Sequence, residues 1–168
     1  MRAIVPGTFD PITLGHLDII HRAVALFDEV IVAVAPSGQK GPWFSQSERV
    51  ELAREACAQF PQVRVDSFSG LLVKYAQQQG SPVIVKGLRA VSDFEFELRM
   101  AHANRLQTPG IETLFVMASA QHSYLSSSIV RELAQFGGDV SGIVPPTVIG
   151  PLLQRAAERN REASHSNP

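Results

Sequence analysis

The sequence has little cysteine and almost no excess of charge. A single cysteine, Cys57, occurs in 168 residues, so no internal disulfide can form and we expect a reducing, cytoplasmic compartment. The formal net charge is −1, which provides no basic footprint for nucleic acid or for an anionic membrane. Although 45% of the residues are apolar, no run approaches the roughly 20 residues that span a bilayer. We therefore predict a cytoplasmic protein with neither a nucleic-acid nor a membrane partner.

Several motifs that carry chemistry are also missing. The sequence contains neither the dinucleotide G-x-G-x-x-G fingerprint nor a P-loop, and it lacks H-E-x-x-H, a Cys/His cluster and G-x-S-x-G. His16 and His21 stand roughly 140° apart around a helix of 3.6 residues per turn, so they cannot ligate one metal. We predict no metal site built by the protein. His21, His102 and His165 are assigned to the surface or to helix packing, and Cys57 to a packed helix face.

Strand-like and helix-like segments alternate along the chain. The expected strands are residues 3–5, 29–35, 63–68, 82–86 and 113–118. The expected helices are residues 16–27, 45–60 (opened by a Ser45-x-x-Glu48 capping box), 71–79, 92–105 (amphipathic), 126–136 and 145–159. This order predicts an α/β fold with a Rossmann-like, doubly wound, five-stranded parallel sheet. Residues 1–159 are expected to form one domain, and the polar tail 160–168 to be disordered.

The most informative segment is the turn Gly7-Thr8-Phe9-Asp10-Pro11-Ile12-Thr13-Leu14-Gly15-His16, between the first expected strand and the first expected helix. Glycine lets a polyphosphate approach the backbone, and the first turn of a helix offers free N–H groups with a partial positive charge. A histidine in that position can contact the anion itself. T-x-G-H alone would be interpreted as a helix start with an incidental histidine, but the strand and turn before it favour a phosphate site.

Polar residues follow the other expected strands as well. Because the carboxyl ends of parallel strands meet at the ligand-binding edge of such a sheet, we expect these residues in one anion pocket. They are Ser37, Gln39 and Lys40; Lys86, Gly87 and Arg89; and Ser119, His122, Ser123 and Ser126 to Ser128. The alternatives are Lys40 as a solvated loop cation, Lys86 and Arg89 in ion pairs with Asp93 or Glu97, and Ser126 to Ser128 as helix caps.

Two motifs resemble signatures of the nucleotidyltransferase superfamily, whose α/β enzymes transfer a nucleotidyl group from a nucleoside triphosphate to a phosphate-bearing acceptor. Thr13-x-Gly15-His16 is similar to the (His/Thr)-x-Gly-His motif, and Ser126-Ser127-Ser128-x-x-Arg131 to a Ser/Thr-Ser-Ser-x-x-Arg motif that contacts the triphosphate. The segments 6–11, 86–97, 101–104 and 138–140 resemble the phosphopantetheine adenylyltransferase family. This resemblance covers residues 2 to about 155, nearly the whole chain.

The resemblance implies a specific reaction. In that family the adenylyl group of ATP passes reversibly to 4′-phosphopantetheine, giving dephospho-coenzyme A and pyrophosphate in coenzyme A synthesis. It also implies a homohexamer. We expect Mg²⁺ as a cofactor, ligated mostly by phosphates and water. Two alternatives stay open: a sister nucleotidyltransferase that uses nicotinate mononucleotide or a small alcohol phosphate, and a non-catalytic ATP-binding regulatory domain.

The resemblance also implies roles for individual residues. The expected catalytic residues are His16, Lys40 and Arg89. The expected ATP contacts are Thr8, Phe9, His16, Gly87, Leu88, Arg89, Glu97, His122, Ser123, Tyr124, Leu125, Ser126, Ser127 and Ser128. The expected 4′-phosphopantetheine contacts are Thr8, Lys40, Leu72, Lys86 and Asn104, the last with a polar helix face as its alternative. Lys86 stands where the family often has arginine, which keeps the charge but loses bidentate phosphate geometry.

Overall fold

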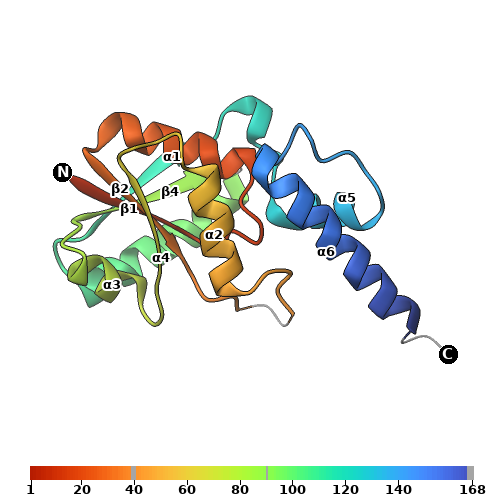
Figure 1. Cartoon of the computed structure of the whole chain (residues 1–168). Coiled ribbons are helices and arrows are strands. Elements are labelled where there is room, and N and C mark those ends of the chain that lie inside the picture. Colours follow the sequence, from red (N-terminus) through yellow and green to blue (C-terminus); the bar gives the residue numbers. More distant parts are fainter. Residues whose placement is uncertain (39–40, 90, 166–168) are drawn as a thin grey trace.

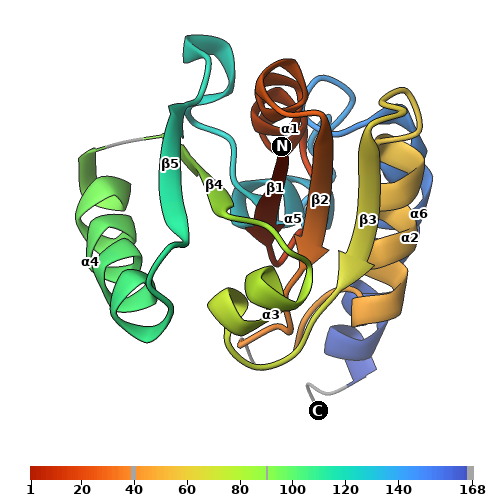
Figure 2. The ribbon, with the colours of Figure 1, turned by 90° about the vertical axis from the view of Figure 1, so that its left-hand side faces the viewer.

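The computed structural model describes residues 1–38, 41–89 and 91–165. Its centre is a five-stranded parallel sheet (Figure 1). The strand order is β3-β2-β1-β4-β5 (Figure 2). The strands are β1 (Arg2–Gly7), β2 (Glu29–Val34), β3 (Val63–Ser67), β4 (Val83–Leu88) and β5 (Glu112–Met117). The chain winds outward from β1 in one direction and from β4 in the other. The predicted doubly wound sheet is confirmed.

Helices cover both faces of the sheet (Figure 2). One face carries α1 (Leu14–Leu26) and α2 (Gln46–Ala56), and the core on this side continues into α5 (Ser127–Gln135) and α6 (Pro146–His165). The other face carries α3 (Leu72–Gln78) and α4 (Val91–Gln107), and a short 3₁₀ helix, η1 (Ala120–His122), follows β5. Among the described residues, no helix is long and apolar enough to cross a membrane.

Alternate residues of the central strands enter two different cores. In β1, Ala3 and Val5 pack toward α1 and α2, whereas Ile4 packs toward α3. The inner residues of β2 are buried throughout, with Val32 in one core and Ile31 in the other. Strands that are buried on both faces need apolar side chains at every position, which explains the continuous apolar run of residues 30–34.

Two helix ends differ from the predictions. The Ser45–Glu48 capping box of α2 is confirmed, but α2 ends at Ala56, because the chain turns at Cys57 ahead of Pro61. In contrast, α6 runs on to His165, so residues 160–165 are helical and the prediction of a disordered tail is wrong for them. Their polar side chains support the helix: Asn160 donates to the Gln135 carbonyl in α5 at 2.9 Å. Residues 166–168 lie outside the described residues.

Helix α4 is confirmed as a helix, but its apolar side chains do not all lie on one face. Phe94 packs edge-on against Phe115 of β5, with ring centroids 5.8 Å apart. Phe96 and Leu106 remain 63% and 80% exposed. The helix therefore presents apolar surface to solvent as well as to the sheet.

The interpretation of Cys57 as a packed thiol is confirmed. Cys57 is buried at the C-terminus of α2, and burial raises the pKa of its thiol to about 11, so it stays protonated at neutral pH. The surface or packing assignments of three histidines also hold. His21 is exposed and lies against Phe60 with ring centroids 5.8 Å apart, and His102 and His165 are exposed on α4 and α6.

Candidate active site

A cavity of about 310 Å³ opens at the carboxyl ends of β1 and β4, where the strand order reverses. Open α/β sheets bind their ligands at this point. The cavity wall is built from the turn after β1, the start of α1, the end of β4 and the segment before α5. It includes many of the predicted residues: Thr8, Phe9, His16, Lys86, Gly87, Arg89, Glu97, His122, Leu125 and Ser126 to Ser128. Segments more than 100 residues apart therefore converge as predicted.

Two glycines allow other residues to pack closely against the strand ends at this cavity. A Cβ atom on Gly7 would lie 2.8 Å from the ring of Phe9, which folds back beneath the turn. A Cβ atom on Gly87, near the end of β4, would lie 2.7 Å from Ile19 of α1. Phe9 itself has φ 48°, a left-handed conformation that costs energy in a non-glycine residue and must be held by its surroundings.

His16 forms a reciprocal cap at the start of α1. The Thr13 hydroxyl accepts from the His16 backbone N–H at 3.3 Å, while Nδ1 of His16 accepts from the Thr13 N–H at 3.0 Å. Because Nδ1 is an acceptor, the proton of the neutral imidazole is on Nε2. The ring also lies edge-on to Phe9, with centroids 5.0 Å apart. The cap thus fixes both the position and the tautomer of a side chain on the cavity wall.

The protonation of His16 follows from its surroundings. Burial, with a smaller contribution from the positive charge of Arg89, lowers the pKa of His16 from 6.5 to about 4. The imidazole is therefore neutral at physiological pH in the unliganded protein. A neutral ring with its proton on Nε2 is a hydrogen-bond donor, and it costs less to bury than an imidazolium ion.

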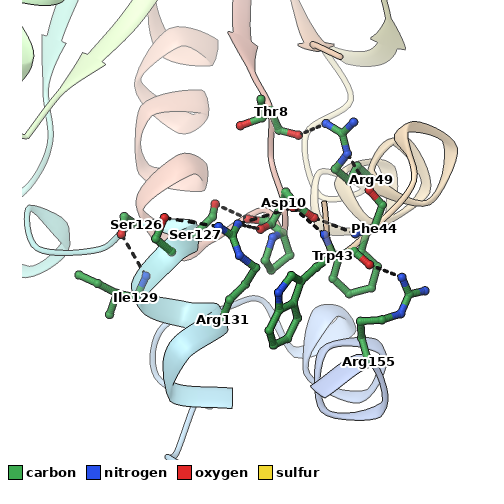
Figure 3. A network of polar contacts seen from close by, with 12 residues as sticks. Thr8, Asp10, Trp43, Phe44, Arg49, Ser126, Ser127, Ile129, Arg131 and Arg155 are labelled. Atoms are coloured by element: carbon green, nitrogen blue, oxygen red, sulfur yellow. Dashed lines mark hydrogen bonds and ion pairs between the residues drawn. The ribbon is translucent and has the colours of Figure 1, made fainter. Parts of the chain in front are cut away.

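Asp10 holds the turn in place through contacts with two other segments (Figure 3). Its two carboxylate oxygens accept from the backbone N–H groups of Trp43 and Phe44, each at 2.9 Å. Arg131 of α5 lies 3.6 Å from the same carboxylate and donates to the Asp10 carbonyl. Asp10 therefore joins the turn after β1, the segment before α2 and helix α5. Asp10 belongs to the turn 7–16, but the sequence pattern alone predicts no role for it.

Ser126, Ser127 and Ser128 lie at the start of α5 and line the cavity, and the first two make different hydrogen bonds. Ser126 is the N-cap of α5, because its hydroxyl accepts from the Ile129 N–H at 3.2 Å, so the capping alternative is confirmed for this residue. The Ser127 hydroxyl donates to the Pro11 carbonyl at 2.8 Å and fastens α5 to the turn. All three serines line the cavity, and the first-turn N–H groups of α5 supply partial positive charge there.

Two cations, Lys86 within β4 and Arg89 just after it, take part in ion pairs while lining the cavity. Arg89 lies 3.2 Å from Asp93 and donates to the Leu125 carbonyl at 3.0 Å. Lys86 Nζ lies 3.1 Å from a carboxylate oxygen of Glu97. The ion-pair alternative is therefore confirmed for both residues, and it does not remove either of them from the cavity wall.

A second cavity, of about 320 Å³, adjoins the first, and Lys86 and Glu97 line both. Its wall is mostly apolar: Ala35, Pro36, Phe68, Leu71, Leu72, Phe96, Met100 and Ala101, with Asn104 and Thr113 as polar members. Leu72 and Asn104 are thus brought together beside Lys86, as predicted. Lys40, expected in the same region, lies outside the described residues.

Three predicted ATP contacts line neither cavity. Leu88 is buried at the end of β4, the Ser123 hydroxyl donates to the Ala120 carbonyl at 2.9 Å, and Tyr124 is 60% exposed. Their contacts with a nucleotide stay predictions. His122 does line the first cavity, and its Nδ1 is buried without a hydrogen-bond partner among the described residues. Buried polar nitrogens normally have a partner, so a ligand in the cavity would supply one.

Comparisons with known proteins agree with this geometry. Residues 4–133 match the model of the cytidylyltransferase-like family. The phosphopantetheine adenylyltransferase of Thiobacillus denitrificans is 52% identical over 162 residues, which cover 96% of this chain and 99% of that protein. The chain belongs to the phosphopantetheine adenylyltransferase family. A second family member, from Nitrosospira multiformis, is 50% identical over 162 residues, 96% of this chain and 98% of its own.

A solved structure agrees with the fold of this family member. A protein described as a nicotinate-nucleotide adenylyltransferase from Vibrio parahaemolyticus superimposes with a TM-score of 0.68 and covers 91% of each chain. The two sequences are 21% identical, so this likeness supports the fold alone. In the phosphopantetheine adenylyltransferase family member described here, the region that matches the family model contains both the Thr13-x-Gly15-His16 motif and the serines that open α5.

Proposed function

We propose that this protein transfers the adenylyl group of ATP reversibly to 4′-phosphopantetheine, giving dephospho-coenzyme A and pyrophosphate. The observation that carries the proposal is the pair of adjoining cavities that share Lys86 and Glu97. The first has the backbone turns, helix N-termini and cations that suit a triphosphate. The second is mostly apolar, with Asn104 and Thr113 as its other polar members, which suits the pantetheine arm. A phosphate that ends this arm would meet the nucleotide beside Lys86. The names of the related enzymes support the same reaction.

The chemistry asks mainly for position and charge. An ionised acceptor phosphate is already a competent nucleophile, so no strong base is needed. The barrier lies in bringing two anions together and in stabilising charge on a five-coordinate phosphorus. In our proposal Lys86 orients the acceptor phosphate, and the Nε2–H of His16 and the first turn of α5 bind the charge that develops on the α-phosphate. Arg89 adds positive charge at the cavity wall, and the family resemblance implies Lys40 as a further cation.

We propose a single displacement. An acceptor oxygen forms a bond to the α-phosphorus as the bond to pyrophosphate breaks, and pyrophosphate leaves with the electron pair. The serine hydroxyls nearest the turn are engaged in capping and in the bond to Pro11. The single cysteine is a buried, protonated thiol. These observations favour direct transfer over a covalent adenylyl-enzyme.

Mg²⁺ is part of the proposal as a companion of the nucleotide. Among the residues described, no group of three or more His, Cys, Asp and Glu side chains could hold a metal ion. Both carboxylate oxygens of Asp10 accept backbone hydrogen bonds, and Glu97 is paired with Lys86. This donor set does not fit a protein-built metal cage. When bound, the ion would neutralise the β- and γ-phosphates, with phosphate and water as its ligands.

We also propose a cytoplasmic homo-oligomer, a hexamer by family resemblance. Large apolar side chains on α4 and β5 support self-association: Phe96, Leu106 and Met117 are 63%, 80% and 62% exposed. Exposed apolar side chains mark an interaction site where they adjoin one another. The single cysteine and the near-zero net charge support a cytoplasmic location without a nucleic-acid or membrane partner.

A panel of acceptors tests the substrate. Pyrophosphate release from ATP is measured with phosphopantetheine, pantetheine, nicotinate mononucleotide and glycerol phosphate. We expect release with phosphopantetheine alone, because pantetheine lacks both the attacking oxygen and the group that Lys86 would pair with. Release with nicotinate mononucleotide but not with phosphopantetheine would contradict the assigned acceptor. ATP binding without turnover of any acceptor would favour the regulatory alternative.

A further inference from the structure

Arg49 is a charged side chain of α2 that is only 2% exposed. Its guanidinium donates to three backbone carbonyls: Phe44 at 3.2 Å, Ala35 at 2.9 Å and Thr8. These carbonyls belong to the segment before α2, the end of β2 and the turn after β1. Figure 3 shows the guanidinium beside the Thr8 carbonyl. One side chain therefore connects the backbone of three segments around the site.

This arrangement is costly to build. Burial lowers the pKa of Arg49, and the charge of Asp10 offsets only part of that effect. Three carbonyls in different directions require the planar, multi-donor guanidinium, because an ammonium group is a compact point charge and would not span them. A structural contact alone could be met more cheaply by apolar packing. The three carbonyls belong to three segments around the site, so the buried charge holds these segments together.

The Thr8 carbonyl is the first link in a chain of contacts that reaches His16. It lies in the peptide unit that leads into Phe9, the residue with the left-handed φ of 48°. Phe9 is 2% exposed, and its ring lies edge-on to the ring of His16 with centroids 5.0 Å apart. By binding the Thr8 carbonyl, Arg49 fixes the orientation of the Thr8–Phe9 peptide plane. This orientation sets the position of the Phe9 ring, which in turn supports the His16 imidazole.

We propose that Arg49 is a positioning residue for adenylyl transfer, acting through Thr8 and Phe9 on the imidazole of His16. The proposal rests on the proposed function for its kinetic consequence. Its structural consequence, a change in the environment of His16 in the unliganded protein, is independent of the proposed function. Arg49 contacts neither cavity, so it is not expected to bind a substrate directly.

The kinetic test compares Arg49→Lys with Arg54→Lys. Lysine keeps the charge but cannot bond to the three carbonyls at once. We expect kcat for pyrophosphate release to fall about 10- to 100-fold, with KM for phosphopantetheine within about threefold, because small misplacements of a catalytic group have effects of this size. Arg54 is on the same helix and pairs with Glu51 in solvent, so Arg54→Lys should match the wild type. Equal kcat in folded Arg49→Lys and wild type would overturn the proposal.

The structural test follows the His16 imidazole by NMR in labelled protein without substrates. The pKa of His16 should rise from about 4 in the wild type toward the ordinary histidine value near 6.5 in Arg49→Lys. The reason is that the imidazole is less firmly held and less buried in this variant. Arg54→Lys should leave this pKa unchanged. An unchanged His16 titration would contradict the proposal, even if thermal stability falls. If the wild-type protein fails to transfer adenylyl groups, the proposed function fails while this coupling is still measured.

A second variant tests the other end of the chain of contacts in case Arg49→Lys does not fold. Phe9→Leu removes the ring contact to His16 while keeping an apolar side chain and the Arg49 bonds. The proposal requires the same direction of change in the His16 titration and a similar fall in kcat. A folded Phe9→Leu protein with the wild-type titration and kcat would overturn it, because Arg49 would then have no route to the imidazole.

Discussion

Replacing His16 by alanine should lower kcat by roughly two to four orders of magnitude, with a smaller change in the KM for ATP. The variant loses the Nε2–H donor that the Thr13 cap holds at the cavity wall. This donor is expected to act mainly on the charge that develops in the transition state, so turnover suffers more than binding. Steady-state pyrophosphate release measures the effect. Turnover within threefold of the wild type in a folded variant would contradict it.

His16→Gln is the matched control for the structural part of this loss. A glutamine at the third helical position can accept the Thr13 N–H bond, as in an ordinary capping box. We expect its thermal stability to stay close to that of the wild type, while its kcat remains well below the wild-type kcat.

The pH profile of kcat/KM provides a further check on the role of His16. Because the pKa of unliganded His16 is lowered to about 4, no loss of activity near pH 6.5 should come from His16. The second ionisation of the acceptor phosphate, at about pH 6, should affect the wild type and His16→Gln alike.

The second large effect is expected from Lys86→Glu. This change places a carboxylate beside Glu97, where the Lys86 ammonium now lies 3.1 Å away, and turns it toward the acceptor phosphate. The loss in kcat/KM for phosphopantetheine should correspond to about 2–5 kcal/mol, or roughly 30- to 5,000-fold. Lys86→Arg should be tolerated, because arginine keeps the positive charge and adds bidentate phosphate geometry. Initial rates at varied phosphopantetheine concentration give kcat/KM for both variants.

ATP binding provides the control for Lys86→Glu. The triphosphate is expected at the turn after β1 and at the start of α5, so calorimetric ATP affinity should change far less than acceptor use. A Lys86→Glu protein with the wild-type KM for phosphopantetheine would show that the acceptor phosphate lies elsewhere. Equal losses for ATP and phosphopantetheine would contradict the separate roles assigned to the two cavities.

The parts of the site that the sequence predicted are those that depend on residues close together in the chain. A strand, a glycine-containing turn and a helix that begins beside His16 are visible within 16 residues, and the sheet-edge rule then groups the polar residues after β4 and β5 with them. The capping box at Ser45 is equally local. Such patterns depend on backbone geometry over a few residues, so one sequence is enough to reveal them.

The supporting contacts could not be predicted in the same way. Asp10 bonds to backbone N–H groups 33 and 34 residues away, and Arg49 bonds to the carbonyl of Thr8, 41 residues away. Their partners are main-chain atoms, which every residue has, so no side-chain pattern marks them. The signal available was the helical spacing that places Arg49 on the same face of α2 as Leu52 and Ala53, which are buried. Chain ends pose a related difficulty, since a polar segment such as residues 160–165 can be helical when its side chains find partners.

Exchange of labelled pyrophosphate into ATP tests the central claim most directly. The protein is incubated with ATP, Mg²⁺ and labelled pyrophosphate, with and without phosphopantetheine, and label in ATP is followed over time. Direct, reversible transfer predicts that label enters ATP only when phosphopantetheine is present, because ATP re-forms only by attack of pyrophosphate on dephospho-coenzyme A. Exchange with ATP alone would reveal an adenylyl-enzyme, and no exchange with phosphopantetheine present would contradict the proposed reaction itself.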